Sequence, residues 1–252
     1  MKNKIISKKN FLKKNNKISN NLFKKKRFFK LYKSFLEKTL QKRVAHQTLW
    51  FDEPILQLPQ DLIIHQELIY NSKPDYFIEV GVAWSGSLLY YSSIFNIIGG
   101  KKVIGIDTYL PNKIYNKIKK FPKLKNKIKL VKGYSTETKV VNKIKSIIGR
   151  SKKIIVHLDS DHSEKNVFKE LEIYSKLIGK GSYLICGDTH VELFNKNPHG
   201  KNKNYFKNNN PMTALKKFLK TKNGKKFKQD LSFQNRYLLT LNPFGVLKKI
   251  RN

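Results

Sequence analysis

Beyond about residue 74, the chain alternates between two patterns of hydrophobic positions. Short apolar runs rich in Ile and Val are followed by longer segments in which apolar residues recur every three or four positions. The short runs predict strands, and the longer segments predict helices. We expect strands over residues 76–80, 102–106, 127–131, 153–158, 182–186 and 236–241, and helices over residues 87–98, 136–148, 164–177 and 214–219. This alternation is typical of an α/β fold in which helices cover both faces of a mostly parallel sheet.

Acidic side chains follow four of the predicted strands at the point where each strand ends. Glu79 and Asp107 close the first two strands, and Asp188 follows the fifth. The fourth strand runs into Asp159 and Asp161. One acid after a strand is as often a helix cap as a ligand-binding group. Because the carboxyl ends of parallel strands meet at one edge of a sheet, we expect these acids together to line a single ligand crevice.

The turn after the first strand, in the sequence DYFIEVGVAWSGSL, is where the backbone is opened for a ligand. Gly81 and Gly86 are spaced differently from a dinucleotide-binding G-x-G-x-x-G, and no Gly-Lys-Ser/Thr follows as in a P-loop. Glu79 would repel a pyrophosphate but suits a cation such as S-adenosylmethionine, and Asp107 is placed to accept hydrogen bonds from ribose hydroxyls. The expected cofactor-binding residues are Glu79, Gly81, Gly86, Ser87, Asp107 and Ser135.

The first 45 residues differ in composition from the rest of the chain. They hold sixteen Lys and Arg residues against one acid, Glu37. We expect residues 1–45 to form a basic arm, helical or partly disordered, and residues 46–252 to form the folded domain. Residues 21–36 could lie on an anionic membrane as a basic amphipathic helix, although a solvated arm is favoured. Deleting the arm to about residue 43 is expected to leave the melting temperature nearly unchanged.

The charge, the cysteine count and the lengths of the apolar runs limit where the protein can be located and what it can bind. The chain has a net charge of +36, but lysine is spread over nearly every segment, which disfavours a dedicated nucleic-acid surface. Cys186 is the single cysteine, so no intrachain disulfide can form. No apolar run reaches the roughly 18 residues of a membrane span, and the N-terminus lacks the apolar centre of a signal peptide. We expect a cytoplasmic protein, with peripheral attachment at the inner face of the membrane as an alternative.

Several ordered segments resemble a known family. They are PILQLPQDL at 54–62, IEVG at 78–81, GID at 105–107, LDSDHS at 158–163, GSYL at 181–184, NPMTA at 210–214 and NPFGVL at 242–247. The region 48–251 resembles the cephalosporin hydroxylase family, a branch of the class I S-adenosylmethionine-dependent methyltransferases that includes rhamnosyl O-methyltransferases. The resemblance implies a Rossmann-like sheet with an antiparallel C-terminal strand. It also implies methyl transfer to a sugar hydroxyl of a polysaccharide, glycolipid or glycosylated metabolite, and leaves a homo-oligomer open.

The same resemblance implies a divalent metal, with Mg²⁺ the expected ion. The matching positions are Asp159, Asp161 and Asp188, whose hard oxygen ligands suit this cation. Gly187 stands where the family usually has glutamate, and imidazole from His190 is a poor substitute. We therefore expect a weakened site, in which Gly187→Glu restores magnesium binding unless the glycine is needed for close approach of the backbone to the substrate.

His162 is the first candidate for the base that accepts the hydroxyl proton, and Asp161 is the second. A purely supporting role for His162 beside the metal acids is equally open. A different class of function is a catalytically impaired methyltransferase fold that binds an anionic membrane or nucleic acid. Oxidation is disfavoured because the sequence shows no His-His-carboxylate iron triad.

Overall fold

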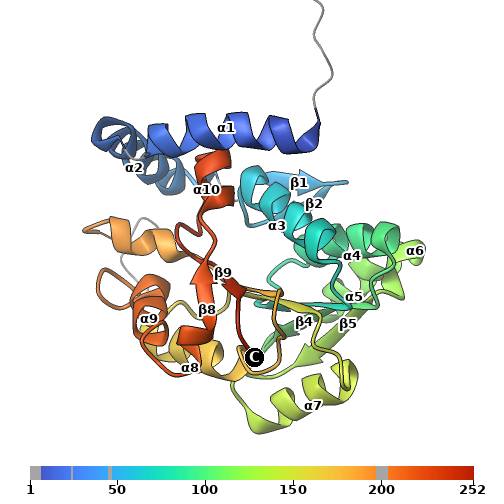
Figure 1. The fold of residues 1–252 in the computed structure, drawn as a ribbon. Coiled ribbons are helices and arrows are strands. Elements are labelled where there is room, and N and C mark those ends of the chain that lie inside the picture. The colour runs from blue at the N-terminus through green and yellow to red at the C-terminus, as the bar shows by residue number, and fades with distance from the viewer. Residues whose placement is uncertain (1–6, 24, 45–46, 197–203) are drawn as a thin grey trace, which may run out of the picture.

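A computed structural model describes residues 7–23, 25–44, 47–196 and 204–252. Its centre is a seven-stranded sheet with the order β5-β4-β3-β6-β7-β9-β8, in which β9 is antiparallel to both of its neighbours (Figure 1). In that order the strands are β5 (Ile128–Lys132), β4 (Lys102–Asp107), β3 (Tyr76–Val80), β6 (Ile154–Leu158), β7 (Tyr183–Cys186), β9 (Val246–Lys249) and β8 (Phe227–Gln229). The five strands from β5 to β7 are parallel.

The direction of chain progression reverses between β3 and β6. From β3 the chain adds β4 and then β5 on one side, and it returns to place β6 and β7 on the other. Such a reversal opens a crevice at the carboxyl ends of the two central strands. Every residue of β3 and of β6 is buried, as expected for central parallel strands covered on both faces.

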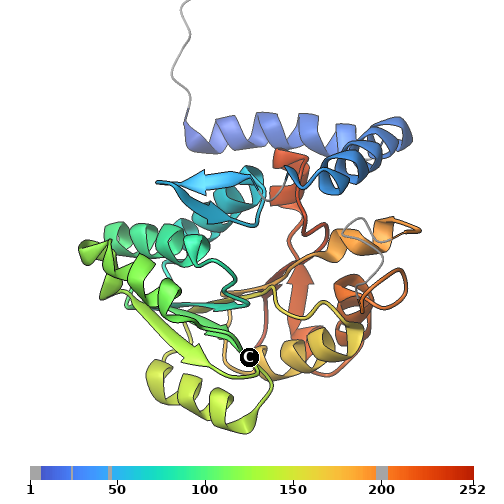
Figure 2. The same ribbon diagram turned by 180° about the vertical axis from the view of Figure 1, so that it is seen from behind.

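Two layers of helices cover the sheet, and alternate strand residues face each layer (Figure 2). Ile78 points into a core shared with α7, α8 and α9, whereas its neighbour Phe77 points into a core shared with α3, α4, α5 and α6. The first group comprises α7 (Thr138–Ile148), α8 (Glu164–Tyr174) and α9 (Pro211–Phe218). The second comprises α3 (Pro59–Ser72), α4 (Gly86–Ile98), α5 (Asn112–Lys119) and α6 (Pro122–Lys125).

The C-terminal strand does not lie where the sequence pattern predicts it. Residues 236–241 form the end of α10 (Ser232–Tyr237) and a loop, and the antiparallel strand is β9 instead. The reason is a buried side chain: the carboxylate of Asp61 accepts hydrogen bonds from the Thr240 hydroxyl and from the Leu241 N–H at 2.9 Å. This segment therefore satisfies its polar groups through a helix side chain rather than through a neighbouring strand. Sequence patterns also missed α3, α5, α6, β8 and a short hairpin, β1 (Thr48–Trp50) with β2 (Glu53–Ile55).

The basic arm carries two helices, α1 (Lys8–Phe23) and α2 (Lys26–Gln41). In α2, Tyr32, Leu36 and Leu40 repeat every four residues and are buried in a cluster with Leu58 and Phe194. The Tyr32 hydroxyl also donates to the carbonyl of residue 240 at 3.0 Å. The expectation that the arm contributes little core is thus wrong for α2, so we now expect deletion of α2 to lower the melting temperature. The predicted boundary at residues 45–46 lies outside the described residues.

Leu36→Ala is expected to lower the free energy of unfolding by about 2–5 kcal/mol, because the leucine is fully buried and a cavity would remain. Leu31→Ala on the exposed side of the same helix is the matched control and should change it by no more than about 0.5 kcal/mol. Denaturant unfolding of both variants measures the difference. Equal stability of the two variants would show that α2 is not part of the folded core.

Among the residues that the structure describes, no helix is both long enough and apolar enough to cross a membrane.

Candidate active site

Two adjoining cavities open at the carboxyl ends of the central strands. The larger, about 780 Å³, is bordered by the three strand-end acids Glu79, Asp159 and Asp188, and by Arg43 beyond the end of α2. The smaller, about 380 Å³, is lined by Asp107, Tyr134, Ser135 and Asp161 among others. Gly81, Ala83 and Asp159 line both cavities. The structure therefore gathers the acids from four strand ends into one crevice, as the sequence predicts.

The loop from β3 to α4 is held in a conformation that only glycine fits at its first position. Gly81 has φ +94°, and a Cβ there would lie 2.0 Å from the carbonyl oxygen of Asp159. Ala83 and Ser85 also have positive φ, at 45° and 68°. Left-handed conformations at non-glycine residues store strain and cluster at functional sites. Close contact between Gly81 and the backbone after β6 therefore determines the conformation of this loop, which borders both cavities.

Asp107 organises that loop in the present structure. One carboxylate oxygen accepts the N–H of Val82 at 2.8 Å and that of Ala83 at 3.3 Å. The other accepts the N–H of Tyr109 at 2.9 Å. The carboxylate is only partly buried and borders the smaller cavity, so it fixes the loop and still faces open space.

Glu79 is almost fully buried and accepts a hydrogen bond from the Ser87 hydroxyl at 2.8 Å. Burial raises its pKa, against the lowering influence of His157, whose Nδ1 lies 3.9 Å from the carboxylate. Burial by itself lowers the pKa of His157, but the nearby carboxylates of Glu79 and Asp159 raise it overall. Sequence reasoning missed His157, although a histidine inside the apolar strand IIVHL is a visible signal.

The other predicted cofactor residues have structural partners. The Ser135 hydroxyl donates to the buried carboxylate of Glu170, which also accepts from Ser160 at 2.8 Å. A Cβ at Gly86 would lie 2.2 Å from the carbonyl oxygen of Pro54, so this glycine lets α4 pack against β2. Gly86 and Ser87 line the larger cavity, and Ser135 lines the smaller one.

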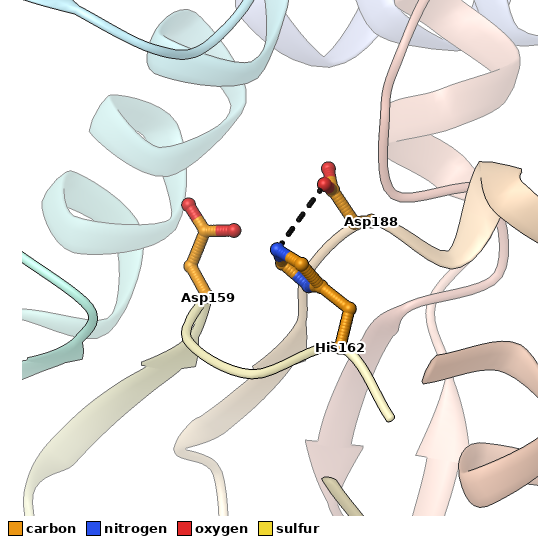
Figure 3. A group of neighbouring side chains, drawn as sticks. All are labelled: Asp159, His162 and Asp188. Carbon is orange, nitrogen blue, oxygen red and sulfur yellow. Dashed lines mark ion pairs between the residues drawn. The ribbon is translucent and has the colours of Figure 1, made fainter. Parts of the chain in front are cut away.

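Asp159, His162 and Asp188 converge in the larger cavity (Figure 3). Each offers one ligand atom, and these atoms lie within 4.8 Å of one another. His162 Nε2 is 3.5 Å from Asp188 Oδ2, and the imidazole stands edge-on to the Tyr205 ring, with centroids 4.9 Å apart. Sequence reasoning missed Tyr205, because only the fold brings residues 162 and 205 together.

The donor set suits a divalent cation. Burial raises the pKa of Asp159, and the neighbouring Asp188 carboxylate raises it further. Two acids at this separation repel one another unless a positive charge lies between them. The two carboxylates provide hard oxygen ligands for such a cation, and the imidazole of His162 lies beside them.

Asp161 is not part of this group. Its carboxylate accepts the N–H of Ser163 at 2.9 Å, at the start of α8, and the side-chain amide of Asn204 at 3.3 Å. It lines the smaller cavity rather than the one that holds the other two acids. The three predicted metal residues are therefore divided, with Asp159 and Asp188 together and Asp161 apart.

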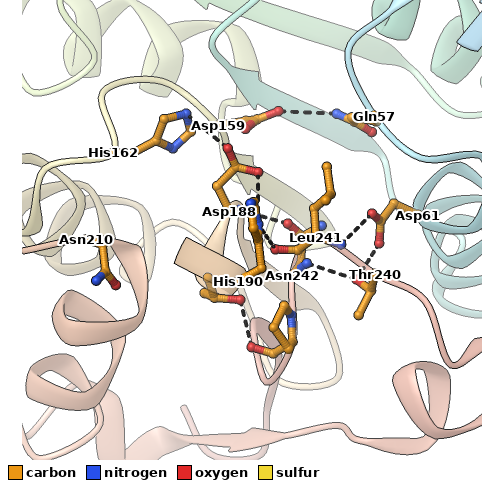
Figure 4. A network of polar contacts seen from close by, with 12 residues as sticks. Gln57, Asp61, Asp159, His162, Asp188, His190, Asn210, Thr240, Leu241 and Asn242 are labelled. Atoms are coloured by element: carbon orange, nitrogen blue, oxygen red, sulfur yellow. Dashed lines mark hydrogen bonds and ion pairs between the residues drawn. The ribbon is translucent and has the colours of Figure 1, made fainter. Parts of the chain in front are cut away.

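A second layer of polar contacts holds these acids in place (Figure 4). The amide of Gln57 donates to Asp159 Oδ2 at 3.4 Å, and the N–H of Asp188 donates to the side chain of Asn242 at 2.9 Å. His190 Nδ1 lies 2.8 Å from the carbonyl oxygen of residue 241 and 3.7 Å from Asp188 Oδ1. Burial lowers the pKa of His190. This histidine therefore packs behind Asp188 instead of replacing a ligand.

Gly187 has no room for a side chain. A Cβ would lie 2.6 Å from the carbonyl oxygen of Leu158, 3.0 Å from Asp159 Oδ1 and 3.3 Å from His157 Nε2. The backbone therefore approaches β6 closely here, which is evidence against the expectation that glutamate at this position restores a metal ligand. The alternative expected from the sequence, a close approach of this backbone to the substrate, stays a prediction.

The sequence is similar to known proteins over most of its length. The family described as Rhamnosyl O-methyltransferase/CmcI matches residues 42–250. A rhamnosyl O-methyltransferase of Mycobacterium leprae is 27% identical over 150 residues, which cover 59% of this chain and 63% of that protein. Its counterpart from Mycobacterium tuberculosis strain H37Rv is 26% identical over 133 residues, 52% of each chain. The matched region thus spans less than two thirds of these curated relatives.

Solved structures share the fold. An apo structure of CmcI superimposes with a TM-score of 0.57 at 19% identity, covering 82% of this chain and 78% of that one. A CmcI structure with Mg and SAM gives 0.53 at 18% identity, covering 81% and 77%. These likenesses, with the strand order, confirm the expected Rossmann-like methyltransferase fold with an antiparallel C-terminal strand and helices on both faces.

Proposed function

The chain belongs to the rhamnosyl O-methyltransferase/CmcI family, and from this premise we propose that it is an S-adenosylmethionine-dependent O-methyltransferase acting on a sugar hydroxyl. The observation that carries the proposal is the crevice at the switch point between β3 and β6. There Glu79 and Asp107 border two adjoining cavities, and Asp159, His162 and Asp188 converge in the larger one. Curated rhamnosyl O-methyltransferases among the relatives support a sugar or other small glycosylated acceptor.

The cofactor would be held by the end of β3, the β3–α4 loop and the end of β4. Glu79 supplies a buried negative charge suited to a cationic ligand, and Asp107 supplies carboxylate oxygens suited to ribose hydroxyls. Gly81 keeps the loop backbone free of a side chain at the point where the two cavities meet. When bound, S-adenosylmethionine would supply an electrophilic methyl group to the acceptor oxygen, with S-adenosylhomocysteine as the leaving group.

The acceptor hydroxyl loses its proton in the larger cavity, and His162 is the proposed base. Its Nε2 lies 3.5 Å from Asp188, whose carboxylate orients the ring and stabilises the imidazolium that forms. The ring edge against Tyr205 restricts its rotation further. Asp161, the second candidate from the sequence, is bound to the N-terminus of α8 and is less well placed to take this proton.

Asp159 and Asp188 are the proposed carboxylate ligands for Mg²⁺, with water completing the shell. A cation held there would orient the sugar hydroxyls and lower the pKa of the one that is methylated. Gln57 and Asn242 keep both ligands in place by hydrogen bonds to the Asp159 side chain and the Asp188 backbone.

Calorimetric titration with S-adenosylmethionine tests the cofactor assignment. Asp107→Ala is expected to weaken binding by about 1–3 kcal/mol, because it removes charged acceptors from both the ligand and the loop. Asp75→Ala is the matched control, since Asp75 directly precedes the other end of β3 and pairs with Lys101 at 3.5 Å. Unchanged affinity in a folded Asp107→Ala protein would contradict the ribose role. Failure of the wild type to bind would contradict the proposed function and favour a catalytically impaired fold.

A further inference from the structure

The helices α1 and α2 lie together along one side of the molecule in both views (Figures 1 and 2). The family match covers residues 42–250, so both helices lie outside the matched region. Glu37 is the single acid in their sequences, and α1 has none. The two helices therefore place a strong positive charge on one side of the molecule.

Exposed apolar side chains accompany this charge. Ile18 on α1 is 60% exposed, and Leu31 and Phe35 on α2 are 63% and 50% exposed. Leu31 and Phe35 are separated by one helical turn, so they stand next to each other on α2. They are adjacent in sequence to the buried Tyr32 and Leu36, which dock the helix on the domain. The helix thus buries one apolar stripe against the domain and leaves a second one in solvent.

Lysines surround the exposed apolar side chains. Lys30 and Lys38 on α2, and Lys14 and Lys17 on α1, are all exposed. From the exposed residues of the two helices we define the arm face as the following eight: Lys13, Lys14, Lys17, Ile18, Lys30, Leu31, Phe35 and Lys38. Basic helices that expose aromatic and aliphatic side chains are typical of proteins that bind an anionic lipid surface.

The arm helices also reach the active-site crevice. Leu40 and Gln41 at the end of α2, with Arg43 beyond it, line the same 780 Å³ cavity as Asp159 and Asp188. A surface bound along α2 would therefore lie beside the cavity in which the acceptor is proposed to react.

We propose that the arm face docks on a bilayer containing anionic lipid. This docking does not depend on the proposed enzymatic function. Lysines supply long-range attraction to anionic head groups, and Ile18, Leu31 and Phe35 enter the interface. Screening of charge by salt should weaken the association.

Co-sedimentation of the full chain with vesicles tests the docking. The wild type should sediment with vesicles of phosphatidylcholine that contain about one third phosphatidylglycerol, and it should lose most of that binding at high salt. With vesicles of pure phosphatidylcholine, the protein should stay in the supernatant. The double variant Lys30→Glu, Lys38→Glu should bind these vesicles at least about tenfold more weakly than the wild type. The matched control is Lys119→Glu, Lys120→Glu, which makes the same charge change on exposed residues at the end of α5.

Equal losses in the two double variants would overturn the proposal, because they would show attraction by overall charge instead of by the arm face. Leu31→Ser with Phe35→Ser should also weaken binding at least severalfold, and no change would contradict insertion of this face. Tighter binding of a single-stranded RNA oligomer than of the vesicles, lost in the Lys30 and Lys38 variant, would assign the face to nucleic acid instead. None of these measurements requires methyl transfer, so a failed docking and a failed enzymatic assignment are distinguishable.

Discussion

Gly187→Glu is expected to destabilise the protein rather than restore a metal site. Even a Cβ at this position would lie 2.6 Å from the carbonyl oxygen of Leu158 and 3.0 Å from Asp159 Oδ1. Because backbone is on one side and a site acid on the other, the side chain can enter only if β6 and β7 move apart. We expect Gly187→Ala to lower the free energy of unfolding by about 1–3 kcal/mol and Gly187→Glu by more.

Thermal and denaturant unfolding measure this effect, and Gly99→Ala is the control. Gly99 has φ +79° with open space around it, so its replacement reports backbone strain of about 1 kcal/mol without crowding. The expected order of stability is wild type, then Gly99→Ala, then Gly187→Ala, then Gly187→Glu. A stable Gly187→Glu protein that binds Mg²⁺ more tightly than wild type would contradict the steric explanation.

His162→Ala is expected to reduce methyl transfer by about 10²- to 10⁴-fold while leaving the affinity for S-adenosylmethionine nearly unchanged. The reason is that the imidazole lies beside Asp188 in the larger cavity, whereas the predicted ribose-binding acid Asp107 borders the smaller one. Initial rates with a rhamnosylated glycolipid, together with calorimetric titration of the cofactor, separate the two effects.

Asp161→Asn is the matched control for this experiment. Asp161 precedes His162 in the chain but accepts the N–H of Ser163, the residue before α8, and borders the smaller cavity, so its loss should change the rate much less. A large loss in Asp161→Asn with a nearly normal rate in His162→Ala would reverse the assignment of the base.

The parallel core of the fold could be predicted because its signal is local. The apolar runs that become β3, β4, β6 and β7 match the observed strands to within one or two residues, and their acids meet in the predicted crevice. The antiparallel strand was misplaced because Thr240 and Leu241 form hydrogen bonds to a distant buried aspartate, Asp61. The pattern of residues 236–241 alone does not indicate that Asp61 will be their hydrogen-bond partner.

The sequence predicts which acids belong to the candidate site, but it does not predict how their side chains are arranged. Asp159 and Asp161 stand two residues apart on one loop, but Asp159 also borders the larger cavity with Asp188, whereas Asp161 borders only the smaller one. Glycine is required at position 187 because atoms of β6 and of the loop that follows it occupy the space of a side chain, and this cannot be seen in the local sequence. Likewise, the packing of Tyr32, Leu36 and Leu40 requires a surface formed by residues far along the chain.

The most direct test of the central claim is the conversion of S-adenosylmethionine to S-adenosylhomocysteine by the wild-type protein with and without a rhamnosylated glycolipid, followed by mass spectrometry of the lipid. The family, the crevice between β3 and β6, and the convergence of Asp159, His162 and Asp188 predict conversion that depends on the lipid and yields one methylated hydroxyl for each cofactor consumed. Binding of S-adenosylmethionine without transfer to this lipid or to free and glycosidic sugars would contradict it.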